Sequence, residues 1–444
     1  MDYTPHTDED VAEMLGTLGL SSAEQLFDSI PTDLKLGRTL QLGDPLSESE
    51  VFDMLSQQAA LNTACDQLTC FAGGGAYDHY IPAVVKALSG RSEFVTSYTP
   101  YQPELSQGVL GALFDYQSMI CRITGMEVAG AGLYDGASAL VEAVRLAAGA
   151  TGRKRVVISQ AINPNYRQVA ETLIAAQNLE LVTANVANGG TTAFSEAELD
   201  GCACLVVGQP NFFGCVEDIV EAADLAHKAG ALLVVHFDPL AAGVLESPGV
   251  LGADVVTGEG QCLGNELNFG GPYLGIFAIH NEHIRRLPGR VCGATLDTRG
   301  NPGYVLTLQT REQHIRREKA TSNICTDQTL MAIAAGIYLS WLGPRGIKEL
   351  GERCMALAHY AAEKLGAVSG CRVRFEGPFL KEFVLEVPVE ADEVLRGLAE
   401  SGYLVGPSLQ SFPDMANCLL VAVTERRTID QIDGLAEALA EVLS

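Results

Sequence analysis

The feature that most constrains the fold is a regular alternation of apolar and amphipathic segments through the middle of the chain. Four apolar segments have the length of strands, and the two segments with helical spacing lie between them; the strands are 156–159, 179–184, 204–208 and 231–237, and the helices 165–177 and 216–228. Strands that alternate with helices form βαβ units, whose strands pair in parallel with helices on both faces of the sheet. The sequence therefore predicts an α/β fold with a mostly parallel, doubly wound sheet.

A glycine-rich stretch at residues 253–278 follows these units. It contains two further predicted strands, 254–257 and 274–279, joined by a turn, while the preceding strand delivers Asp238 to the same edge of the sheet. Open α/β sheets bind ligands at this edge. Enzymes that use pyridoxal phosphate (PLP) hold it there with a carboxylate on the ring nitrogen and a lysine as Schiff base. Asp238 supplies the carboxylate, but no lysine follows it in this stretch.

The helix predicted to start within residues 133–140 is where a PLP fold would bind the phosphate with backbone N–H groups. Asp135 lies at the expected N-cap of this helix. Its carboxylate occupies the positive end of the helix dipole and would repel a phosphate. An ordinary aspartate cap, the simpler interpretation, leads to the same expectation of no phosphate here.

The chain divides into three predicted parts. Residues 1–60 form an N-terminal helical arm with capping boxes at Thr7 and Ser47, and residues 61–326 form the large α/β domain. Residues 327–444 form a small α+β domain that begins with a long apolar helix; its predicted strands are 373–375, 383–387 and 419–423, and its predicted helices are 391–400 and 428–443.

Two loops combine glycine or proline with polar aromatic residues. Three glycines precede Tyr77 and His79, which could face a ligand or a partner or simply lie in a surface turn. Tyr98, Tyr101 and Gln102 form a second polar surface, which favours a ligand-facing or interface role. We expect Pro103 to open the helix that follows, with an apolar stripe from Leu105 to Ile123 and Gly125 as its terminator.

Residues 311–319 carry the one basic cluster of a strongly acidic chain. It is interpreted either as a solvated helix face or as a surface for an anion or an acidic partner. Lys319 is not expected to act as a Schiff-base residue, because its charged neighbours would keep it hydrated and protonated. A short polar segment, Thr321, Ser322 and Asn323, follows.

Composition narrows the classes of partner. The formal charge is −26, with 29 Lys and Arg against 55 Asp and Glu, which argues against nucleic acid and anionic membranes. No segment approaches ~18 uninterrupted apolar residues and no leader is apparent at the start, so we expect a cytoplasmic protein. The 12 cysteines include no paired C-x-x-C set, so buried thiols such as Cys202 and Cys204 are expected rather than metal ligands or disulfides.

Four long runs in this sequence resemble the glycine cleavage system P-protein, in particular its subunit 1 where the enzyme is split into two chains; they are residues 73–80, 98–104, 258–264 and 310–325. The resemblance implies a fold-type-I PLP-dependent transferase architecture and a heterodimer that pairs into an α2β2 tetramer. It also implies decarboxylation of glycine on PLP and transfer of the aminomethyl group to the lipoylated H-protein. In the split family the PLP lysine belongs to subunit 2.

The position that matches the family lysine is occupied here by Gln261 and Cys262, neither of which can form a Schiff base. The chain alone is therefore expected to bind no PLP, with Asp238 a vestige of a shared ancestor. The residues expected to contribute to the partner's site are Tyr98, Tyr101, Gln102, Tyr77, His79, Thr321, Ser322 and Asn323.

Three alternatives remain at this point. The chain could be a self-sufficient PLP enzyme that uses another lysine, or Cys262 could be a nucleophile in acyl transfer. It could also be a purely structural partner that never contacts substrate.

Overall fold

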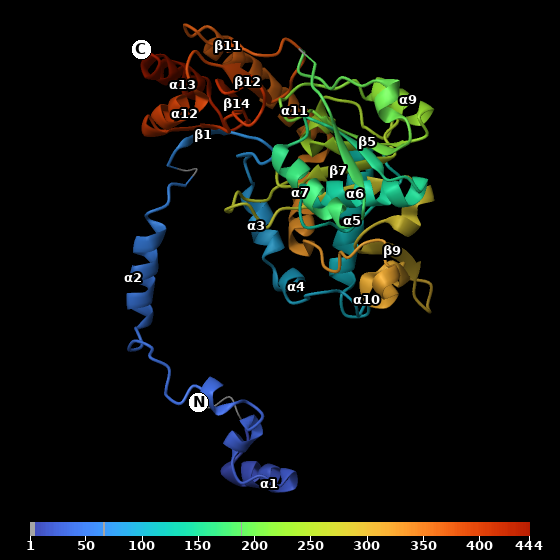
Figure 1. Cartoon of the computed structure of the whole chain (residues 1–444), viewed down its shortest axis with the longest axis vertical. Helices are drawn as coiled ribbons and strands as arrows, with labels where there is room; N and C mark the ends of the chain where they lie inside the picture. The colour runs from blue at the N-terminus through green and yellow to red at the C-terminus, as the bar shows by residue number, and fades with distance from the viewer. Residues whose placement is uncertain (1–4, 65–66, 188) are drawn as a thin grey trace. The chain divides into compact units, whose positions relative to one another are not determined.

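The computed structural model describes residues 5–64, 67–187 and 189–444. The chain forms two compact units, residues 1–63 and residues 64–444, whose elements are labelled in Figure 1.

The first unit contains helices α1 (Asp8–Leu18) and α2 (Glu48–Ala59) and two short 3-10 turns, η1 (Ala23–Phe27) and η2 (Thr32–Leu34). Both predicted capping boxes are present: Thr7 with Asp10 opens α1, and Ser47 with Glu50 opens α2. None of the residues described between 5 and 63 is buried. Local capping therefore defines these helices, and the arm has no core of its own.

The second unit is built on a seven-stranded sheet with the order β2-β8-β7-β6-β5-β3-β4. The strands are β2 (Val128–Ala129), β3 (Arg155–Ser159), β4 (Glu180–Ala184), β5 (Cys202–Gln209), β6 (Leu232–Phe237), β7 (Val255–Glu259) and β8 (Gly275–Ile279). Strands β3 to β7 pair in parallel, while β8 and β2 are antiparallel additions at one edge. The predicted parallel doubly wound sheet is confirmed.

Two apolar cores cover the two faces of this sheet. Along β5, Leu205 and Val207 belong to the first core, and Cys204 and Val206 belong to the second. The first core includes α5 (Gln107–Thr124) and α9 (Ile219–Lys228), and the second includes α6 (Gly136–Thr151) and α7 (Pro164–Ala175). Because side chains alternate along a strand, a strand covered on both faces is apolar along most of its length, as β5 is from Cys202 to Gly208.

Helix α5 begins later than the sequence predicts. Pro103 lies in a turn, and the helix starts at Gln107 after Ser106, whose φ of −119° is not helical. Leu105, expected in the apolar stripe, is 78% exposed because it precedes the helix. The predicted terminator is correct: Gly125 is the C-cap, with a φ of 72° that favours glycine.

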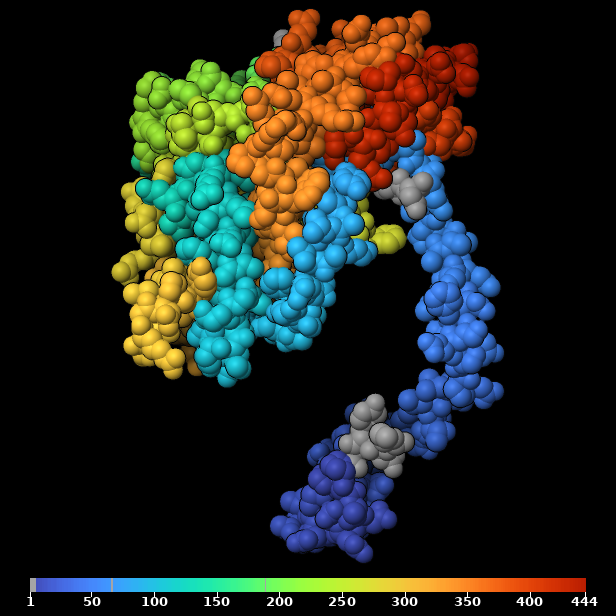
Figure 2. Space-filling model, turned by 180° about the vertical axis from the view of Figure 1, so that it is seen from behind, coloured from blue at the N-terminus to red at the C-terminus, as the bar shows by residue number. Residues whose placement is uncertain are grey.

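Helix α11 (Thr329–Gly366) is long and apolar enough, by length and composition, to span a membrane. It changes direction at Gly343, where φ is 61°, and Pro344 follows inside the helix. Its first half packs against α5 and α3 (Ala83–Ser89), and the space-filling view shows it between these elements (Figure 2). Ala332, Ile333 and other residues of this half are buried in the first core, so α11 is a core helix of the unit.

The C-terminal part contains a three-stranded sheet of β11 (Arg372–Val373), β12 (Glu382–Glu386) and β14 (Cys418–Ala422), with α12 (Ala391–Glu400) and α13 (Ile429–Val442). Strand β13 (Tyr403–Gly406) pairs instead with β1 (Thr69–Ala72), which precedes the large sheet in the chain. The sequence placed residues 69–72 within the large domain. A single strand has no local signal for a partner more than 300 residues away, so this pairing was not predictable.

The remaining elements are short. They are α4 (Ser92–Val95), α8 (Glu196–Leu199), η3 (Pro239–Gly243), η4 (Asn281–Arg286), the hairpin of β9 (Val291–Leu296) and β10 (Pro302–Thr307), η5 (Gln309–Arg311), α10 (Gln313–Arg316) and η6 (Arg317–Lys319).

Gly214, in the loop after β5, presses against the backbone of Glu382 at the start of β12. Its φ is +82°, and an added Cβ would overlap the Glu382 carbonyl group. We predict that Gly214→Ala lowers the free energy of unfolding by about 3 kcal/mol or more, since strain and overpacking add. Gly201→Ala is the matched control: φ is +67° but no atom lies within 4 Å, so a loss of about 1–2 kcal/mol is expected. Urea denaturation measures both, and equal losses would contradict the close contact.

Candidate functional site

A cleft lies at the carboxyl ends of the central strands, where the sequence places the candidate site. Asp238 follows β6, and Glu259 ends β7; both line a cavity of about 70 Å³ together with Tyr77, Cys262 and Glu382. Pockets that hold drug-sized ligands or cofactors usually measure ~300–1,000 Å³. Side chains of the chain itself reduce this space to the volume of a few waters.

Asp238 forms a buried ion pair with Lys381. The Lys381 Nζ lies 2.7 Å from Asp238 Oδ2 and 3.8 Å from the centre of the Tyr77 ring. Burial alone would lower the pKa of Lys381, but the attraction of Asp238 outweighs it and raises the pKa to about 12. The same pair holds the pKa of Asp238 below its usual value against the effect of burial. Lys381 is therefore a protonated cation at the carboxylate that would hold the cofactor ring.

Sequence reasoning missed Lys381. A primary amine does lie in the cleft, contrary to expectation, but it comes from the residue before β12 and not from the glycine-rich turn. Protonated and held by Asp238, it has no lone pair with which to attack a carbonyl group. No sequence signal could have found it, because 143 positions separate it from Asp238.

The start of α6 is occupied by two carboxylates. Asp135 is the N-cap, as predicted, and accepts a hydrogen bond from the Ser138 N–H at 2.7 Å. Glu259 Oε2 accepts from the Gly136 N–H at 2.9 Å, and its Oε1 accepts from the N–H groups of Gln261 and Leu274, each at 3.0 Å. Burial raises the pKa of Glu259 to about 7. The N–H groups of Gly136 and Ser138, which could otherwise bind a phosphate, are thus already paired.

Gln261 and Cys262, which we expect at the position of the family lysine, are 2% and 3% exposed. The Gln261 amide bonds both the N–H and the C=O of Tyr77, at 2.9 and 3.2 Å. Cys262 Sγ lies 3.9 Å from Asp238 Oδ1, and burial raises the pKa of this thiol well above its usual value. An activated nucleophile needs a lowered pKa, so the environment opposes the acyl-transfer alternative.

Tyr77 and His79 both point into this chain's own cleft. The Tyr77 hydroxyl donates to Glu382 Oε2 at 3.0 Å. His79 contacts Glu425 through Nδ1 at 2.7 Å and Lys381 through Nε2 at 3.3 Å. Since an ammonium group can only donate, Nδ1 is the nitrogen that donates to Glu425. Their contribution to a partner's site remains a prediction.

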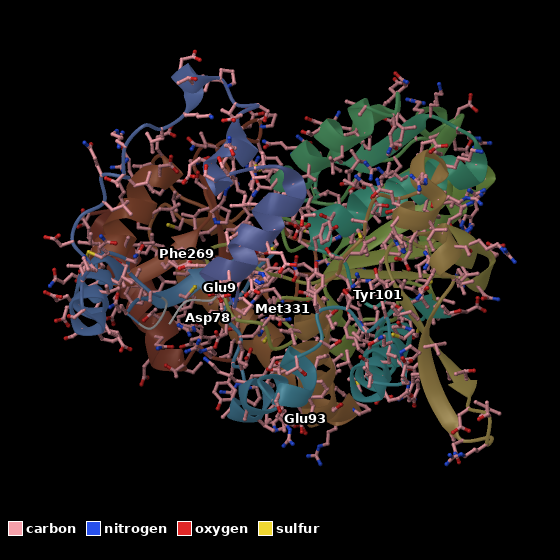
Figure 3. All side chains as sticks on the ribbon, turned by 90° about the horizontal axis from the view of Figure 1, so that it is seen from below. Glu9, Asp78, Glu93, Tyr101, Phe269 and Met331 are labelled. Atoms are coloured by element: carbon pink, nitrogen blue, oxygen red, sulfur yellow. The ribbon has the colours of Figure 1, made fainter. Side chains whose placement is uncertain are left out.

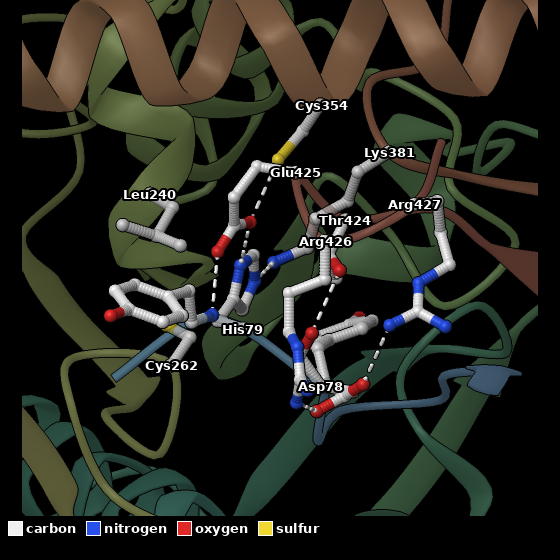
Figure 4. A network of polar contacts seen from close by, with 12 residues as sticks. Asp78, His79, Leu240, Cys262, Cys354, Lys381, Thr424, Glu425, Arg426 and Arg427 are labelled. Atoms are coloured by element: carbon white, nitrogen blue, oxygen red, sulfur yellow. Dashed lines mark hydrogen bonds and ion pairs between the residues drawn. The ribbon is translucent and has the colours of Figure 1, made fainter. Parts of the chain in front are cut away.

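The adjoining Asp78 is held by the segment that follows β14, at the same end of the C-terminal sheet as Lys381, as Figure 4 shows. Its carboxylate pairs with Arg426 and, at 3.0 Å, with Arg427, while its carbonyl accepts from Thr424. Residues 424–427 directly follow β14, a strand-end charge run that is visible in the sequence. Its partner could not be read there.

His79, Glu425 and Cys354 bring possible metal-ligand atoms within 4.8 Å of one another. The Lys381 ammonium group beside His79 opposes a further cation. Burial also raises the pKa of Cys354 to about 12, which disfavours the thiolate that a metal would require.

The second predicted loop lies at the surface. Tyr98 is 84% exposed, Tyr101 is 48% exposed, and Gln102 is also exposed. The Tyr101 ring packs edge-on against His314 at 6.3 Å and lies 5.5 Å from the Arg290 guanidinium. Tyr101 is labelled among the side chains drawn in Figure 3. The structure therefore joins the tyrosine loop to the basic run, two motifs that the sequence kept apart.

Arg290 anchors this arrangement and was missed by the sequence analysis. It forms a buried pair with Asp327 at 3.1 Å, and both side chains retain a polar atom without a hydrogen-bond partner, Arg290 Nε and Asp327 Oδ2.

The basic run does not form the helix face considered above. Only residues 313–316 are α-helical, flanked by short turns, because Arg311 is drawn to the backbone carbonyls of Leu287, Leu308 and Gly289. Lys319 is exposed in the last of these turns.

The polar segment after this run is partly tied to α6. Asn323 accepts from Arg145 at 3.3 Å, and Ser322 caps the Ile324 N–H at 3.1 Å. Thr321 and Asn323 are exposed.

The residues of the cleft do not fit PLP. The ring partner Asp238 has a cation of its own, Glu259 and Asp135 bind the N–H groups of Gly136 and Ser138 at the start of α6, and Gln261 and Cys262 offer no amine.

Comparisons with known proteins place the chain in a family. The family model described as glycine cleavage system P-protein matches residues 1–439. The chain belongs to the glycine cleavage system P-protein family. Among relatives of the same family, proteins named "Probable glycine dehydrogenase (decarboxylating) subunit 1" from Moorella thermoacetica and Carboxydothermus hydrogenoformans are each 48% identical; the alignments cover 100% and 99% of both chains. The two-chain P-protein resemblance is thereby confirmed.

Solved structures identify the fold. A crystal structure of glycine decarboxylase (P-protein) of the glycine cleavage system, in inhibitor-bound form, is 43% identical, covers 100% of both chains and has a TM-score of 0.91. Glutamate decarboxylase from Lactobacillus brevis, 14% identical with a TM-score of 0.67, covers 91% of this chain and 94% of its own and shares the fold alone. The fold is the PLP-dependent fold-type-I architecture, as predicted.

Glu382 allows a test of the electrostatics of the cleft. Burial raises its pKa to about 7 from the usual 4.5, so the protonated form stabilises the folded state. The contribution of this pKa shift to the free energy of unfolding is fully present below about pH 4.5 and is lost as pH rises to about 7. We predict that Glu382→Gln, which can still bond Gly74 and Tyr77, gains about 3 kcal/mol relative to wild type between pH 4.5 and pH 7.5.

Denaturation midpoints across this pH range measure the difference. Glu400→Gln, a change at an exposed glutamate, is the control and should follow wild type. A constant difference between Glu382→Gln and wild type would show that Glu382 is ionised throughout.

Proposed function

We propose that the chain acts as subunit 1 of a two-chain glycine dehydrogenase (decarboxylating), the P-protein of the glycine cleavage system. The complex would decarboxylate glycine and transfer the aminomethyl group to the lipoylated H-protein, with the PLP lysine supplied by subunit 2. One observation carries this proposal. The polar groups of the cleft are paired within the chain, whereas the polar side chains of Tyr98, Tyr101 and Gln102 are exposed at the surface, where another chain could contact them.

The outward loop is suited to complete a site on another chain. Two prolines restrict its backbone. The Arg290 guanidinium lies over the face of the Tyr101 ring and His314 packs edge-on against it, and both contacts fix the ring. The Tyr101 hydroxyl and the Gln102 amide can then donate or accept hydrogen bonds without first being ordered. In this proposal PLP supplies the electron sink for decarboxylation when bound, and residues of this chain orient the substrate and exclude water.

The further parts of the proposal rest on the family resemblance. They are assembly with subunit 2 as α2β2, docking of the H-protein, glycine as substrate and a cytoplasmic location.

Removal of one hydroxyl tests the site contribution. We predict that Tyr101→Phe, assembled with subunit 2, lowers the turnover of glycine by about tenfold to hundredfold, the value of one hydrogen bond to a charged group. Gln102→Ala should have a similar effect. The ring contacts of Tyr101 remain in the phenylalanine variant, so the dissociation constant between the subunits should not change.

Tyr403→Phe, on the distant strand β13, is the matched control and should keep full turnover. Unchanged turnover in both Tyr101→Phe and Gln102→Ala would favour the purely structural role instead.

The placement of PLP is tested with separated chains. We predict that the isolated chain mixed with PLP gives no stable visible absorbance band and no stoichiometric lysine label after borohydride reduction, because Lys381 is protonated and paired. The complex should carry the label on subunit 2. A single labelled lysine on this chain would establish the self-sufficient alternative. Cys262→Ser should leave the turnover of the complex unchanged.

A further inference from the structure

We propose that Lys381 and Glu259 take the places of the two charged ends of a cofactor. The chain's own side chains then fill the cleft and form an ionic joint, that is, a set of polar and charged contacts between the two main sheets. This inference deepens the proposed function and rests on its statement that this chain binds no PLP. It concerns the chain's own stability and ligand binding, which can be measured without catalysis.

The first end is the carboxylate of Asp238. In PLP enzymes such a carboxylate pairs with the protonated ring nitrogen, a cationic N–H donor. The Lys381 ammonium group is also a cationic N–H donor, and it lies 2.7 Å from Asp238 Oδ2. It rests over the face of the Tyr77 ring at 3.8 Å, which adds a cation–π contact. The charge requirement of Asp238 is therefore met from within the chain.

The second end is the start of α6. A phosphate bound there would accept hydrogen bonds from backbone N–H groups and interact favourably with the helix dipole. The Glu259 carboxylate accepts one bond from the Gly136 N–H at the first residue of α6, and two more from the backbone N–H groups of Gln261 and Leu274 outside this helix. Glu259 is 7% exposed, so it excludes solvent as well as competing anions from this position. A carboxyl group of the chain thus takes the place of an external phosphate.

Glu259 lines the cavity, Lys381 contacts its lining residues Asp238 and Tyr77, and the two stand-ins come from different parts of the unit. Lys381 and Glu382 adjoin the start of β12, whereas Asp238 and Glu259 lie at the carboxyl ends of β6 and β7. Glu382 strengthens the same joint, because its Oε1 accepts from the Gly74 N–H at 2.7 Å and its Oε2 from Tyr77.

Close packing at glycine confirms that this joint is fitted to the backbone. An added Cβ on Gly73 would overlap the Glu382 carboxylate, and one on Gly214 would overlap its main chain. The triple-glycine turn singled out in the sequence thus serves to admit Glu382 to the cleft.

Burial makes the two ions of the first end mutually dependent. The side chains of Lys381 and Asp238 are 8% and 17% exposed. Loss of one partner would leave the other charge desolvated and unpaired, which is far more costly than loss of both. This dependence predicts a specific pattern of stability among single and double variants.

Ligand binding tests the stand-in role. Pyridoxine 5′-phosphate is the probe, because it has the ring nitrogen and the phosphate but no aldehyde, and so needs no lysine. Equilibrium dialysis with the full chain should detect no binding to wild type at millimolar probe. The double variant Lys381→Ala/Glu259→Ala should bind the probe with a dissociation constant at least tenfold below this millimolar limit. Adding Asp238→Ala to the double variant should abolish the binding again.

Stability tests the joint independently of any ligand. Lys381→Met and Asp238→Asn should each lower the thermal midpoint of the full chain by several degrees, and the double variant should recover at least half of the combined loss. If a single variant fails to fold, recovery of a folded double variant supports the proposal equally well.

Three outcomes would overturn the inference: probe binding to wild type, no gain in binding by the opened variant, or purely additive losses in the double variant. Failure of the proposed function is separate, since it would appear as lack of turnover by wild type with subunit 2 while these results stand.

Discussion

The ion pair between Lys381 and Asp238 is the interaction on which the arrangement of this molecule depends. It joins the residue before β12 to the residue after β6, and so fixes the C-terminal sheet against the carboxyl edge of the large one. A charge buried this deeply is stable only beside its partner. Two further contacts reinforce the joint: Glu382 accepts a hydrogen bond from the Gly74 N–H, and Asp78 pairs with Arg427.

The joint closes the cleft of this chain, so that the cleft and the outward polar loop have separate roles. In the inward cleft, polar groups such as Lys381 and Asp238 satisfy one another. The outward surface keeps a rigid loop with Tyr98, Tyr101 and Gln102, supported by the buried Arg290–Asp327 pair. A chain built in this way can contribute side chains to a neighbour while its own core stays closed.

The comparisons show how little of the fold depends on detailed sequence. The glutamate decarboxylase structure shares only 14% identity yet has a TM-score of 0.67. The apolar strands and the helical spacing between them are sufficient to specify the shared sheet, because burial on both faces requires only apolar side chains of suitable size. The polar residues of the cleft are less constrained by the fold, and in this chain they bind one another.

The sequence by itself determined the parallel sheet, the helices around it, the caps at Thr7, Ser47 and Asp135, and the lack of a lysine near Gln261. These are local properties: side-chain period, capping chemistry and residue identity act over a few positions. The start of α5 was predicted too early, because a proline signals a turn as readily as a helix start. Only the tertiary structure decided that Lys381 reaches Asp238, that Glu259 closes α6, that β1 pairs with β13, and that Tyr101 rests on Arg290. Each of these contacts joins residues from about 120 to more than 300 positions apart, and no local pattern encodes which distant charge or strand folding will bring alongside.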